Sequence, residues 1–356
     1  MSAIVDTHAD AAALELAPLL IREPLAAFLD AHGLCGGGSD PLVAEPVGEG
    51  HSNVTFLVRR GAHEVVLRRP PRPPLPPSAH DVLREARLLR AVADAPVRTP
   101  RVLATCEDDG VIGAPFYVME KVEGDVITTQ VPPTLDSPQQ RERIADELID
   151  ALVEVHAVDW RACGLEGYGR PTGYLDRQLR RVSGLWEHNK TREIATLDRV
   201  TRWLHDHRPE SGPATIVHGD YRLGNVMYAH EAPARLNAIF DWELATIGDP
   251  LADVGYLTAT YAQPGDPDTT FARFAVTTRP GFPTRAELIA RYEERSGRSM
   301  SDVAWYATLA LWKAAIFLEG SYKRLLAGTT DDPFFQALDT GVPALAEHAW
   351  AVAHGE

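Results

Sequence analysis

Ile216-Val-His-Gly-Asp-Tyr-Arg-Leu-Gly-Asn-Val226, followed by Ala238-Ile-Phe-Asp-Trp242, is the part of the sequence that decides the fold. Asp220 and Asn225 lie five positions apart in a polar loop between apolar segments, and Asp241 comes at the end of a third apolar segment. A positioned carboxylate can accept the proton of a hydroxyl. Carboxylate and amide oxygens are hard ligands that suit Mg²⁺. The spacing therefore predicts a base and a metal site on neighbouring loops.

Phosphoryl transfer from ATP needs these three groups: one carboxylate to orient a hydroxyl, and an amide and a second carboxylate to hold Mg²⁺ on the phosphates. Asp-x₄-Asn followed by an apolar strand that ends in Asp has the spacing of the catalytic and metal loops of kinases. A lone His218-Gly219-Asp220 is equally compatible with an ordinary turn at a strand end. All three elements in order indicate a kinase.

Composition narrows the choice of partners. The chain has 356 residues, enough for two lobes, and its hydrophobic content of 45% supports a sizeable core. The net charge is −15, from 35 basic and 50 acidic residues. Nucleic acid and anionic membranes need basic surface, so neither is expected as a partner. The expected partner is a small-molecule hydroxyl acceptor.

The cysteines and the N-terminal sequence bear on the compartment. Cys35, Cys106 and Cys163 are scattered, with no spacing typical of zinc or of a disulfide framework. The first ten residues have no basic segment before an apolar one, so no secretory signal is expected. The apolar stretch Leu309–Leu318 is short and contains Lys313. We expect a cytoplasmic protein.

The first third of the sequence predicts a small sheet with helices. Apolar residues at helical spacing predict an N-terminal helix over 14–32, and Val82–Ala93 predicts another, with Asp81 as N-cap. Five strands are expected, at 42–47, 54–60, 64–69, 101–106 and 116–119. Beyond them the pattern is mainly helical, beginning with Ser137-Pro138-Gln139-Gln140 as a helix start. The prediction is an α+β, protein-kinase-like fold: an N-terminal lobe (1–119), a hinge (120–124) and a helical C-terminal lobe (125–356).

The chain resembles the aminoglycoside phosphotransferase family, which has a protein-kinase-like fold and phosphorylates small molecules. The matching residues are His218-Gly219-Asp220-x₄-Asn225, Phe240-Asp241 and Gly248-Asp249-Pro250-x₂-Asp253, and the resemblance covers roughly residues 30–345. Within the family, it is most similar to the phosphotransferase domain fused to acyl-CoA dehydrogenases in larger proteins. The remaining residues are too few for a dehydrogenase domain, so no dehydrogenase activity is expected.

The resemblance implies roles for the loop residues. Asp220 would be the catalytic base, because a loose transition state needs orientation and late proton acceptance more than a strong base. Asn225 and Asp241 would hold Mg²⁺. His218 and Gly219 would shape the loop rather than react. His156 and Asp253 are taken as structural residues. Arg222 is open to two roles, a phosphate contact or a structural salt bridge.

Between two expected strands, Gly48-Glu49-Gly50-His51-Ser52-Asn53 stands where kinases place a glycine-rich loop over the phosphates. Glycine allows close backbone approach, and amide N–H groups can contact phosphate oxygens. The third glycine of the kinase pattern is missing, with Asn53 near its place. The motif alone is also compatible with a plain hairpin turn. Its position predicts that Gly48, Gly50, Ser52 and Asn53 contact the nucleotide.

The lysine that usually anchors the phosphates is absent from the N-terminal lobe, since the four lysines are at 121, 190, 313 and 323. Side chains alternate along a strand, so Val66 and Arg68 share one face and Arg69 points the other way. This arrangement predicts Val66 over adenine and Arg68 at the phosphates, with Glu85 as its acidic partner. Arginine can bind phosphate with two parallel donors. A solvated charge at the strand end is the alternative for Arg68.

The hinge, with Glu120 and Val122, is expected to meet adenine through backbone groups. Trp242 and Glu243 stand where protein kinases have Phe-Gly, and only seven residues separate Asp241 from Asp249. That interval leaves no room for a phosphorylatable activation loop. Regulation of the protein-kinase type is therefore not expected.

The acceptor is the least determined part, because fold and motif do not fix it. A basic-aromatic stretch could bind an anionic, partly apolar ligand or could be a plain surface helix; it contains Arg177, Leu179, Arg180, Arg181, Leu185, Trp186 and Lys190. A set of aromatics is more typical of core than of a pocket: Tyr256, Tyr261, Trp305, Tyr306, Trp312 and Tyr322. The resemblance implies a hydroxyacyl-CoA acceptor. An aminoglycoside or amino-alcohol kinase and a catalytically silent nucleotide-binding protein remain as alternatives.

Overall fold

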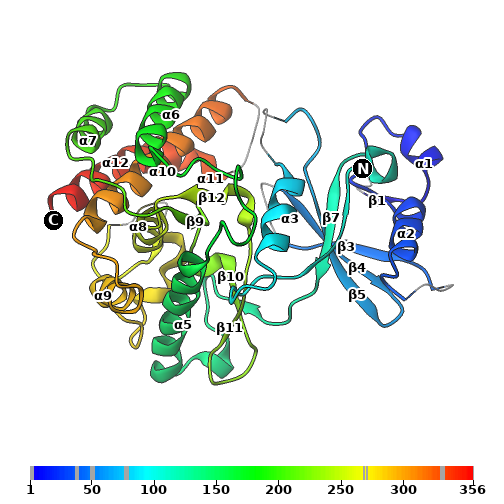
Figure 1. Cartoon of the computed structure of the whole chain (residues 1–356). Coiled ribbons are helices and arrows are strands. Elements are labelled where there is room, and N and C mark those ends of the chain that lie inside the picture. The colour runs from blue at the N-terminus through cyan, green and yellow to red at the C-terminus, as the bar shows by residue number, and fades with distance from the viewer. Residues whose placement is uncertain are drawn as a thin grey trace. The chain divides into compact units, whose positions relative to one another are not determined.

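The computed structural model describes residues 4–36, 40–48, 53–75, 80–267, 269, 272–328 and 333–355. The chain forms two compact units, one made of residues 1–95 and 99–123 and the other of residues 96–98 and 124–356 (Figure 1). The expected hinge residues 120–123 are thus grouped with the first unit. The short segment 96–98 belongs to the second unit although the sequence on both sides of it belongs to the first.

The first unit contains a five-stranded antiparallel sheet in the order β3-β4-β5-β7-β6. Its strands are β3 (Val43–Pro46), β4 (Val54–Arg60), β5 (His63–Arg69), β6 (Val102–Cys106) and β7 (Phe116–Glu120). All five lie where the sequence predicts strands. Gly61, with φ 57°, makes the turn between β4 and β5; glycine adopts this left-handed conformation without steric cost.

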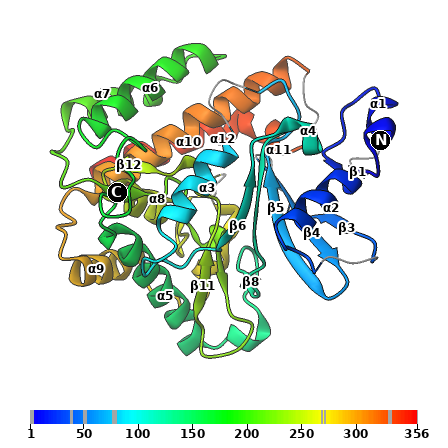
Figure 2. The ribbon, with the colours of Figure 1, turned by 45° about the vertical axis from the view of Figure 1, so that its right-hand side comes forward.

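Two helices lie over opposite faces of this sheet (Figure 2). Helix α2 (Arg22–Ala31) contributes Leu25 and Leu29 to a buried cluster with Leu67 of β5. Helix α3 (Val82–Ala91) lies over the other face, where Arg68 of β5 reaches it. Asp81 caps α3 by accepting a hydrogen bond from the Arg84 amide, as predicted. The alternation of β5 therefore directs Leu67 towards α2 and Arg68 towards α3.

The predicted helix over residues 14–32 is wrong in its first half. Residues 20–21 form β2 (Leu20–Ile21), which pairs in parallel with β1 (Ile4–Val5). In the sequence, α1 (His8–Ala12) comes between these two strands. Pro18 disfavours helical backbone in the residue before it, and Pro24 is tolerated only in the first turn of a helix. The helix therefore begins at Arg22. A short α4 (Asp109–Ile112) completes the unit.

The second unit is mainly helical, as predicted. Its helices are α5 (Pro138–Ala157), α6 (Tyr174–Asn189), α7 (Ala195–Asp206), α8 (Leu251–Thr260), α9 (Arg285–Ser296), α10 (Val303–Leu326), α11 (Pro333–Gln336) and α12 (Leu338–His354), with 3₁₀ turns η1 (Pro133–Leu135) and η4 (Ala272–Thr278). Ser137 caps α5 through the Gln140 amide, as predicted. Helices α6, α7, α10 and α12 share one apolar core. None of the described helices has the length and apolar character needed to cross a membrane.

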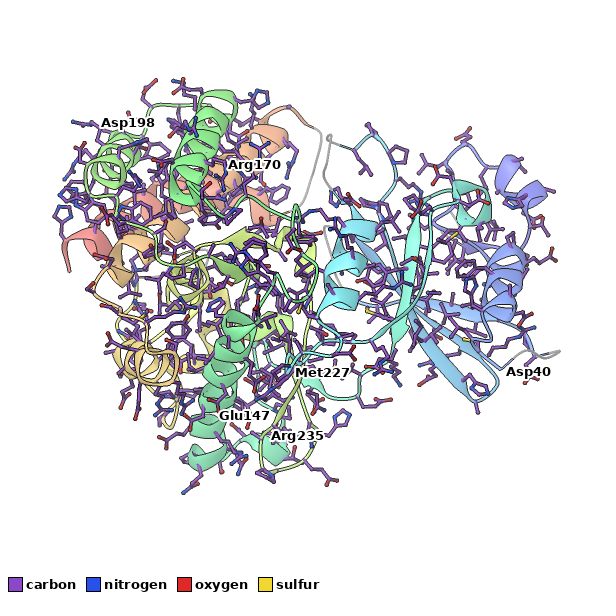
Figure 3. The ribbon with its side chains drawn as sticks, in the orientation of Figure 1. Asp40, Glu147, Arg170, Asp198, Met227 and Arg235 are labelled. Atoms are coloured by element: carbon purple, nitrogen blue, oxygen red, sulfur yellow. The ribbon has the colours of Figure 1, made fainter. Side chains whose placement is uncertain are left out.

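Two small sheets of the second unit carry the loops of interest. One joins β11 (Leu236–Ile239), β10 (Val226–Tyr228) and β8 (Asp125–Val126), and the other pairs β12 (Thr246–Gly248) with β9 (Thr215–Val217). Figure 3 marks Met227 on β10, Arg235 beside β11, and Glu147 on α5. Buried hydroxyls fix the first sheet to α5, because Tyr228 donates to the Ile144 carbonyl at 2.7 Å.

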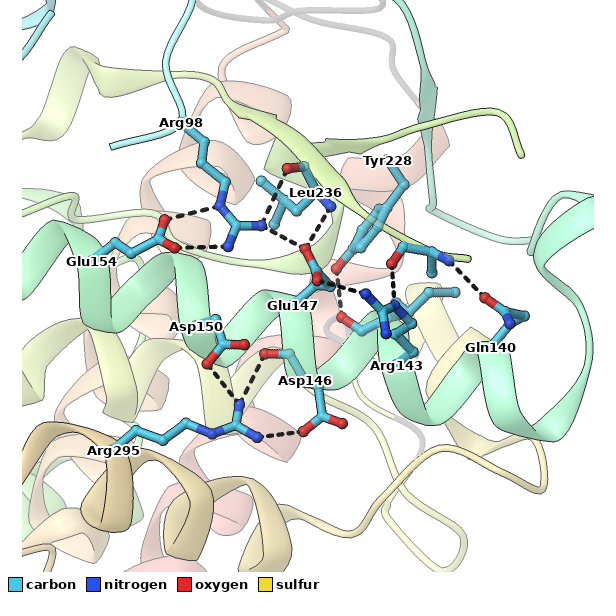
Figure 4. Close-up of polar contacts among 12 residues, drawn as sticks. Arg98, Gln140, Arg143, Asp146, Glu147, Asp150, Glu154, Tyr228, Leu236 and Arg295 are labelled. Atoms are coloured by element: carbon cyan, nitrogen blue, oxygen red, sulfur yellow. Dashed lines mark hydrogen bonds and ion pairs between the residues drawn. The ribbon is translucent and has the colours of Figure 1, made fainter. Parts of the chain in front are cut away.

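Arg98 holds segment 96–98 on the same helix (Figure 4). Its guanidinium donates two hydrogen bonds to Glu154, at 2.9 and 2.7 Å, and one to Glu147 at 2.6 Å. The Arg98 carbonyl accepts from the Ile239 amide at 2.7 Å. A bidentate arginine–carboxylate pair fixes geometry as well as energy. Arg98 thereby ties β11, the strand that leads into Asp241, to α5.

Candidate active site

The predicted catalytic residues lie on the loop between β9 and β10, which contains the 3₁₀ turn η2 (Leu223–Asn225). Gly219 has φ 89°, and a Cβ there would lie 2.9 Å from the Leu244 Cβ. Only glycine fits that backbone and that approach. Tyr221 anchors the loop from below by donating to the Leu148 carbonyl of α5 at 2.6 Å. The backbone conformation and the close packing thus explain why the residue before Asp220 is glycine.

Asp220 is held by three side chains. Asn225 Nδ2 donates to one carboxylate oxygen at 2.7 Å and to the Asp220 carbonyl at 2.8 Å. Arg222 Nε lies 3.5 Å from the other oxygen. The Tyr256 hydroxyl of α8 also hydrogen-bonds to Asp220; burial, and then the charge of Asp220, hold the pKa of Tyr256 well above its ordinary value. Tyr256 is therefore a neutral donor that helps to aim the carboxylate.

Hydrogen bonds to Asp253 of α8 hold the backbone of the loop. The Asp253 carboxylate is fully buried and accepts from the His218 amide at 2.6 Å and the Gly219 amide at 2.7 Å. His156 Nε2 lies 3.2 Å from it, and His156 Nδ1 contacts the Tyr292 hydroxyl at 2.7 Å. Burial alone raises the pKa of Asp253, but these partners, His156 first, lower it below its ordinary value. The buried charge therefore replaces its lost hydration with fixed donors.

His218 joins the catalytic loop to the predicted metal loop. Its Nδ1 accepts from the Asp220 amide at 3.2 Å, so its Nε2 carries the proton and donates to the Phe240 carbonyl at 2.9 Å. The imidazole packs against Trp242, with ring centroids 4.6 Å apart. Both ring nitrogens are engaged within the backbone of the two loops, the loop-shaping role expected of this residue.

Asn225 and Asp241 have the chemistry of a Mg²⁺ site. Because Asn225 Nδ2 donates to Asp220, its Oδ1 is left as the acceptor atom. Asp241 has φ 64° and ψ 56°, a costly left-handed conformation for a non-glycine residue, of the kind that gathers at functional sites. The Phe240 amide donates to the Asn225 carbonyl at 2.8 Å, which ties the two loops together. In the described part of the chain no three His, Cys, Asp or Glu residues cluster as a metal site. The donor set fits Mg²⁺, which takes few protein ligands and completes its shell with phosphates and water.

In the first unit, Arg68 and Glu85 form the predicted pair. Arg68 Nε donates to Glu85 Oε2 at 2.9 Å, and Glu85 is only 2% exposed. Arg69 points to the other face, where it donates to the carbonyls of Leu19 and Ile112. Lys121, the lysine nearest this strand in sequence, forms ion pairs with two glutamates. The geometry is that of a phosphate-anchoring cation held by a helix acid; phosphate binding itself stays a prediction.

The other predicted nucleotide contacts are less defined. Gly48 has φ 81° and follows β3, and Asn53 is buried just before β4, whereas Gly50 and Ser52 lie outside the described residues. Val66 lies on the Arg68 face of β5. Glu120 Oε1 accepts from the Arg101 amide at 3.0 Å. Val122 makes no backbone hydrogen bond within the residues described, and its contact with adenine stays a prediction.

A family model described as "Phosphotransferase enzyme family" matches residues 43–295, more than two thirds of the chain. This chain belongs to the phosphotransferase enzyme family. It is 35% identical over 327 residues to acyl-CoA dehydrogenase family member 10 of Mus musculus, which covers 91% of this chain and 30% of the mouse protein. It is 32% identical over 321 residues to family member 11 of Rattus norvegicus, covering 88% of this chain and 41% of the rat protein. The chain thus spans less than half of the length of these two relatives.

Among solved structures, a Ralstonia eutropha protein described as an aminoglycoside phosphotransferase superposes with a TM-score of 0.79 at 32% identity. The match covers 94% of this chain and 99% of that one. The kinase-like α+β fold predicted for this phosphotransferase is confirmed.

Sequence reasoning missed two residues of this phosphotransferase site. Tyr256 was grouped with core aromatics, and Trp305, Tyr306 and Trp312 do lie in the core, but Tyr256 reaches Asp220. Its signal is its spacing, because it stands three residues after Asp253 on the same helix face. The second residue, close enough to the predicted base to respond to its charge, is Lys313: burial and then Arg181 lower the pKa of Lys313, and the charges of Asp253 and Asp220 raise it. A lone lysine within an apolar helix was its signal.

Proposed function

We propose that this protein transfers the γ-phosphate of ATP to a hydroxyl group of a small molecule, with Mg²⁺. The observation that carries the proposal is the support of Asp220 by Asn225, Arg222 and Tyr256 on a loop whose backbone is held by buried Asp253. A carboxylate fixed in this way needs little reorganisation when it meets a substrate. The support would be difficult to explain for a protein that only binds nucleotides.

In the proposed reaction, the acceptor oxygen attacks the γ-phosphorus of ATP while the bond from that phosphorus to the β–γ bridging oxygen breaks. ADP leaves with the electron pair, and the hydroxyl proton passes to Asp220. Asn225 and Asp241 would hold Mg²⁺, which neutralises charge on the phosphate oxygens when bound. Arg222 lies beside the Asp220 carboxylate, where its charge favours an anionic group near the base.

The first unit supplies the nucleotide contacts in this proposal. Arg68, held by Glu85, takes the role of the usual lysine because a guanidinium can donate two parallel bonds to phosphate oxygens. Val66 on the same face is placed against adenine, and the backbone of Glu120 and Val122 against its edge. Gly48, Gly50, Ser52 and Asn53 remain proposed phosphate contacts.

For the acceptor we propose a hydroxyacyl-CoA, with a 4-hydroxyacyl-CoA as the first candidate. Support comes from the relatives, whose names include an acyl-CoA dehydrogenase and whose sequences contain a segment like this chain. A second candidate, an aminoglycoside or amino-alcohol, is favoured by the similarity to the Ralstonia eutropha structure. The two acceptor classes carry opposite charge, so they can be separated directly.

The test is incubation of the purified chain with Mg-ATP and either a pool of hydroxyacyl-CoAs or a pool of aminoglycosides, followed by mass analysis for an added phosphate. Phosphate on an acyl-CoA supports the proposal, and phosphate on an aminoglycoside supports the second candidate. An Asp220→Asn sample run in parallel identifies contaminating kinases. Nucleotide binding with no product from either pool would favour a silent nucleotide-binding protein.

A further inference from the structure

The basic stretch on α6 separates into engaged and unengaged residues. Arg177 donates to the carbonyls of Thr172 and of Arg170, which Figure 3 marks next to α6. Arg180 donates to the Asp176 carbonyl at 3.3 Å, and Lys190 pairs with Glu187 at 2.8 Å. The contacts of these three cations are thus made within α6 and the residues just before it. Arg181 is exposed and makes no hydrogen bond or ion pair within the described residues.

Lys313 of α10 is another cation without a hydrogen-bond or ion-pair partner among the described residues. The residue is partly buried. Helices α6 and α10 pack together, since Asn189 donates to the Ile316 carbonyl at 3.0 Å. The charge of Arg181 acts on Lys313, and so do the charges of Asp220 and Asp253. Tyr306, two turns before Lys313 on the same face of α10, donates to Asp249 next to the start of α8 at 2.8 Å, so this face of α10 is turned towards the helix that carries Asp253. Lys313 therefore lies within electrostatic range of Arg181 and of the carboxylates of Asp253 and Asp220.

This arrangement costs free energy in the unliganded protein. Burial, and then Arg181, lower the pKa of Lys313 to about 8. A buried cation near a like charge is stabilised only when an anion joins it. The protein has a surplus of 15 acidic charges, yet neither cation is paired with one of the described carboxylates. An anionic ligand would satisfy both cations.

An apolar surface adjoins the pair. Phe317 stands one turn after Lys313 on α10, on the same face, and is 47% exposed. On α6, Leu185 stands one turn after Arg181 and is partly buried. Each of the two cations is therefore followed, one turn later on its own helix, by an apolar side chain, of which Phe317 is exposed.

We propose that Lys313 and Arg181 bind an anionic group of the acceptor and so determine which molecules are phosphorylated at Asp220. The inference rests on the proposed function and deepens it, because it assigns the acceptor class to two residues. A polycationic aminoglycoside would be repelled from this pair, and a molecule with phosphate or carboxylate groups and an apolar arm would be favoured.

The experiment compares two acceptors that share one hydroxyl. One is 4-hydroxypentanoyl-CoA, and the other is the pantetheine thioester of the same acid, which lacks the phosphates. Binding to the full chain is measured by calorimetry for the wild type, Lys313→Met, Arg181→Met and the matched control Arg180→Met. We expect the first two variants to bind the CoA ester about tenfold more weakly. Their affinity for the pantetheine ester and for Mg-ATP stays at the wild-type value, as does every affinity of the control.

A pH series supplies a second measurement that does not depend on the Met variant folding. Wild-type affinity for the CoA ester falls as pH rises through about 8, because Lys313 loses its proton there while Asp220 and Asp253 favour its retention and Arg181 its loss. Lys313→Arg, always charged, shows no such fall. Equal CoA-ester affinity in all variants overturns the inference, and so does weakening of Mg-ATP binding instead.

Transfer is measured on the same samples. If the CoA ester binds as expected but no phosphate is transferred, the proposed function fails and the anion site stands. If transfer occurs while Lys313→Met and Arg181→Met leave KM for the acceptor unchanged, the anion site fails and the proposed function stands.

Discussion

Asp253 is fully buried and Lys313 is partly buried, on the adjacent helices α8 and α10 of the second unit, and the surroundings of these two charges are opposite. Asp253 has the two loop amides of His218 and Gly219 and the His156 ring as partners. Lys313 has none among the described residues. Partners keep Asp253 ionised, whereas burial makes Lys313 easier to deprotonate. Asp253 is thus a charge that stabilises the fold, whereas Lys313 is a charge that the fold leaves available to a ligand.

Arg68 belongs with the first kind, although a ligand is also proposed for it. Its partner Glu85 is fixed on α3, so the guanidinium has one defined direction without phosphate present. A cation paired with a protein carboxylate has a fixed orientation before a ligand binds. An unpaired cation has no carboxylate beside it to compensate its charge. The predictions below disturb each kind in turn.

The largest effect is expected from Asp220→Asn. The substitution keeps the shape of the side chain and one acceptor oxygen but removes the base, so kcat falls by about 10²–10⁴-fold. Mg-ATP affinity stays within a few-fold, because Asp220 does not hold the nucleotide. Steady-state transfer and direct nucleotide binding check both halves. A large loss of Mg-ATP affinity contradicts the assignment of Asp220 as the base.

Asp253→Ala tests the fully paired charge. Two loop amides and His156 lose their acceptor together, so the free energy of unfolding falls by about 3–5 kcal/mol. The loop that carries Asp220 then loses its fixed backbone, and kcat falls with it. Urea unfolding and activity at a temperature where both proteins are folded provide the measurement.

The matched control is Asp176→Ala. Asp176 lies on the solvent side of α6 and pairs with exposed Arg208 at 3.1 Å. Exposed pairs contribute about 0–1 kcal/mol, so this variant stays close to the wild type. Equal losses in the two variants would show that Asp253 is not a special anchor.

The catalytic loop and Arg68 were predictable from sequence because their geometry is local. The spacing of Asp220 and Asn225 is fixed by one turn of chain, and alternation along β5 fixes the side on which Arg68 lies. The position of Lys313 relative to α8 and α6 depends on the packing of α10 against those helices, which no local spacing encodes. The N-terminal helix was overextended because apolar periodicity was given more weight than Pro18 and Pro24. Packing partners and proline positions, rather than motifs, account for the errors.

Arg68→Met tests the paired cation of the first unit. Loss of a charged donor to phosphate raises KM for ATP by about tenfold. Arg68→Lys, which restores the residue usual in kinases, stays within a few-fold. Arg59→Met on neighbouring β4 is the control, because Arg59 pairs with the exposed Glu45 and the partly buried Glu64. If Arg68→Met leaves KM for ATP unchanged, Arg68 is a structural charge and the phosphates have another anchor.

The smallest effect concerns stability at alkaline pH and tests the unpaired charge without any ligand. The folded-state pKa of Lys313 is about 8, against an ordinary value of 10.5. Between these values the unfolded chain binds a proton that the folded chain lacks, so this group makes stability rise with pH. At pH 7 Lys313 is charged in both states, and its burial costs about 1–3 kcal/mol.

Lys313→Met removes that cost, so we expect the variant to be more stable than the wild type at pH 7 and the difference to shrink towards pH 10. Urea unfolding of both proteins across this range isolates the contribution of Lys313 from other groups that titrate in both. A variant that loses CoA-ester affinity while gaining stability would mark Lys313 as a charge retained for its ligand. A variant less stable than the wild type at every pH would instead place Lys313 with Asp253, among the charges that hold the fold.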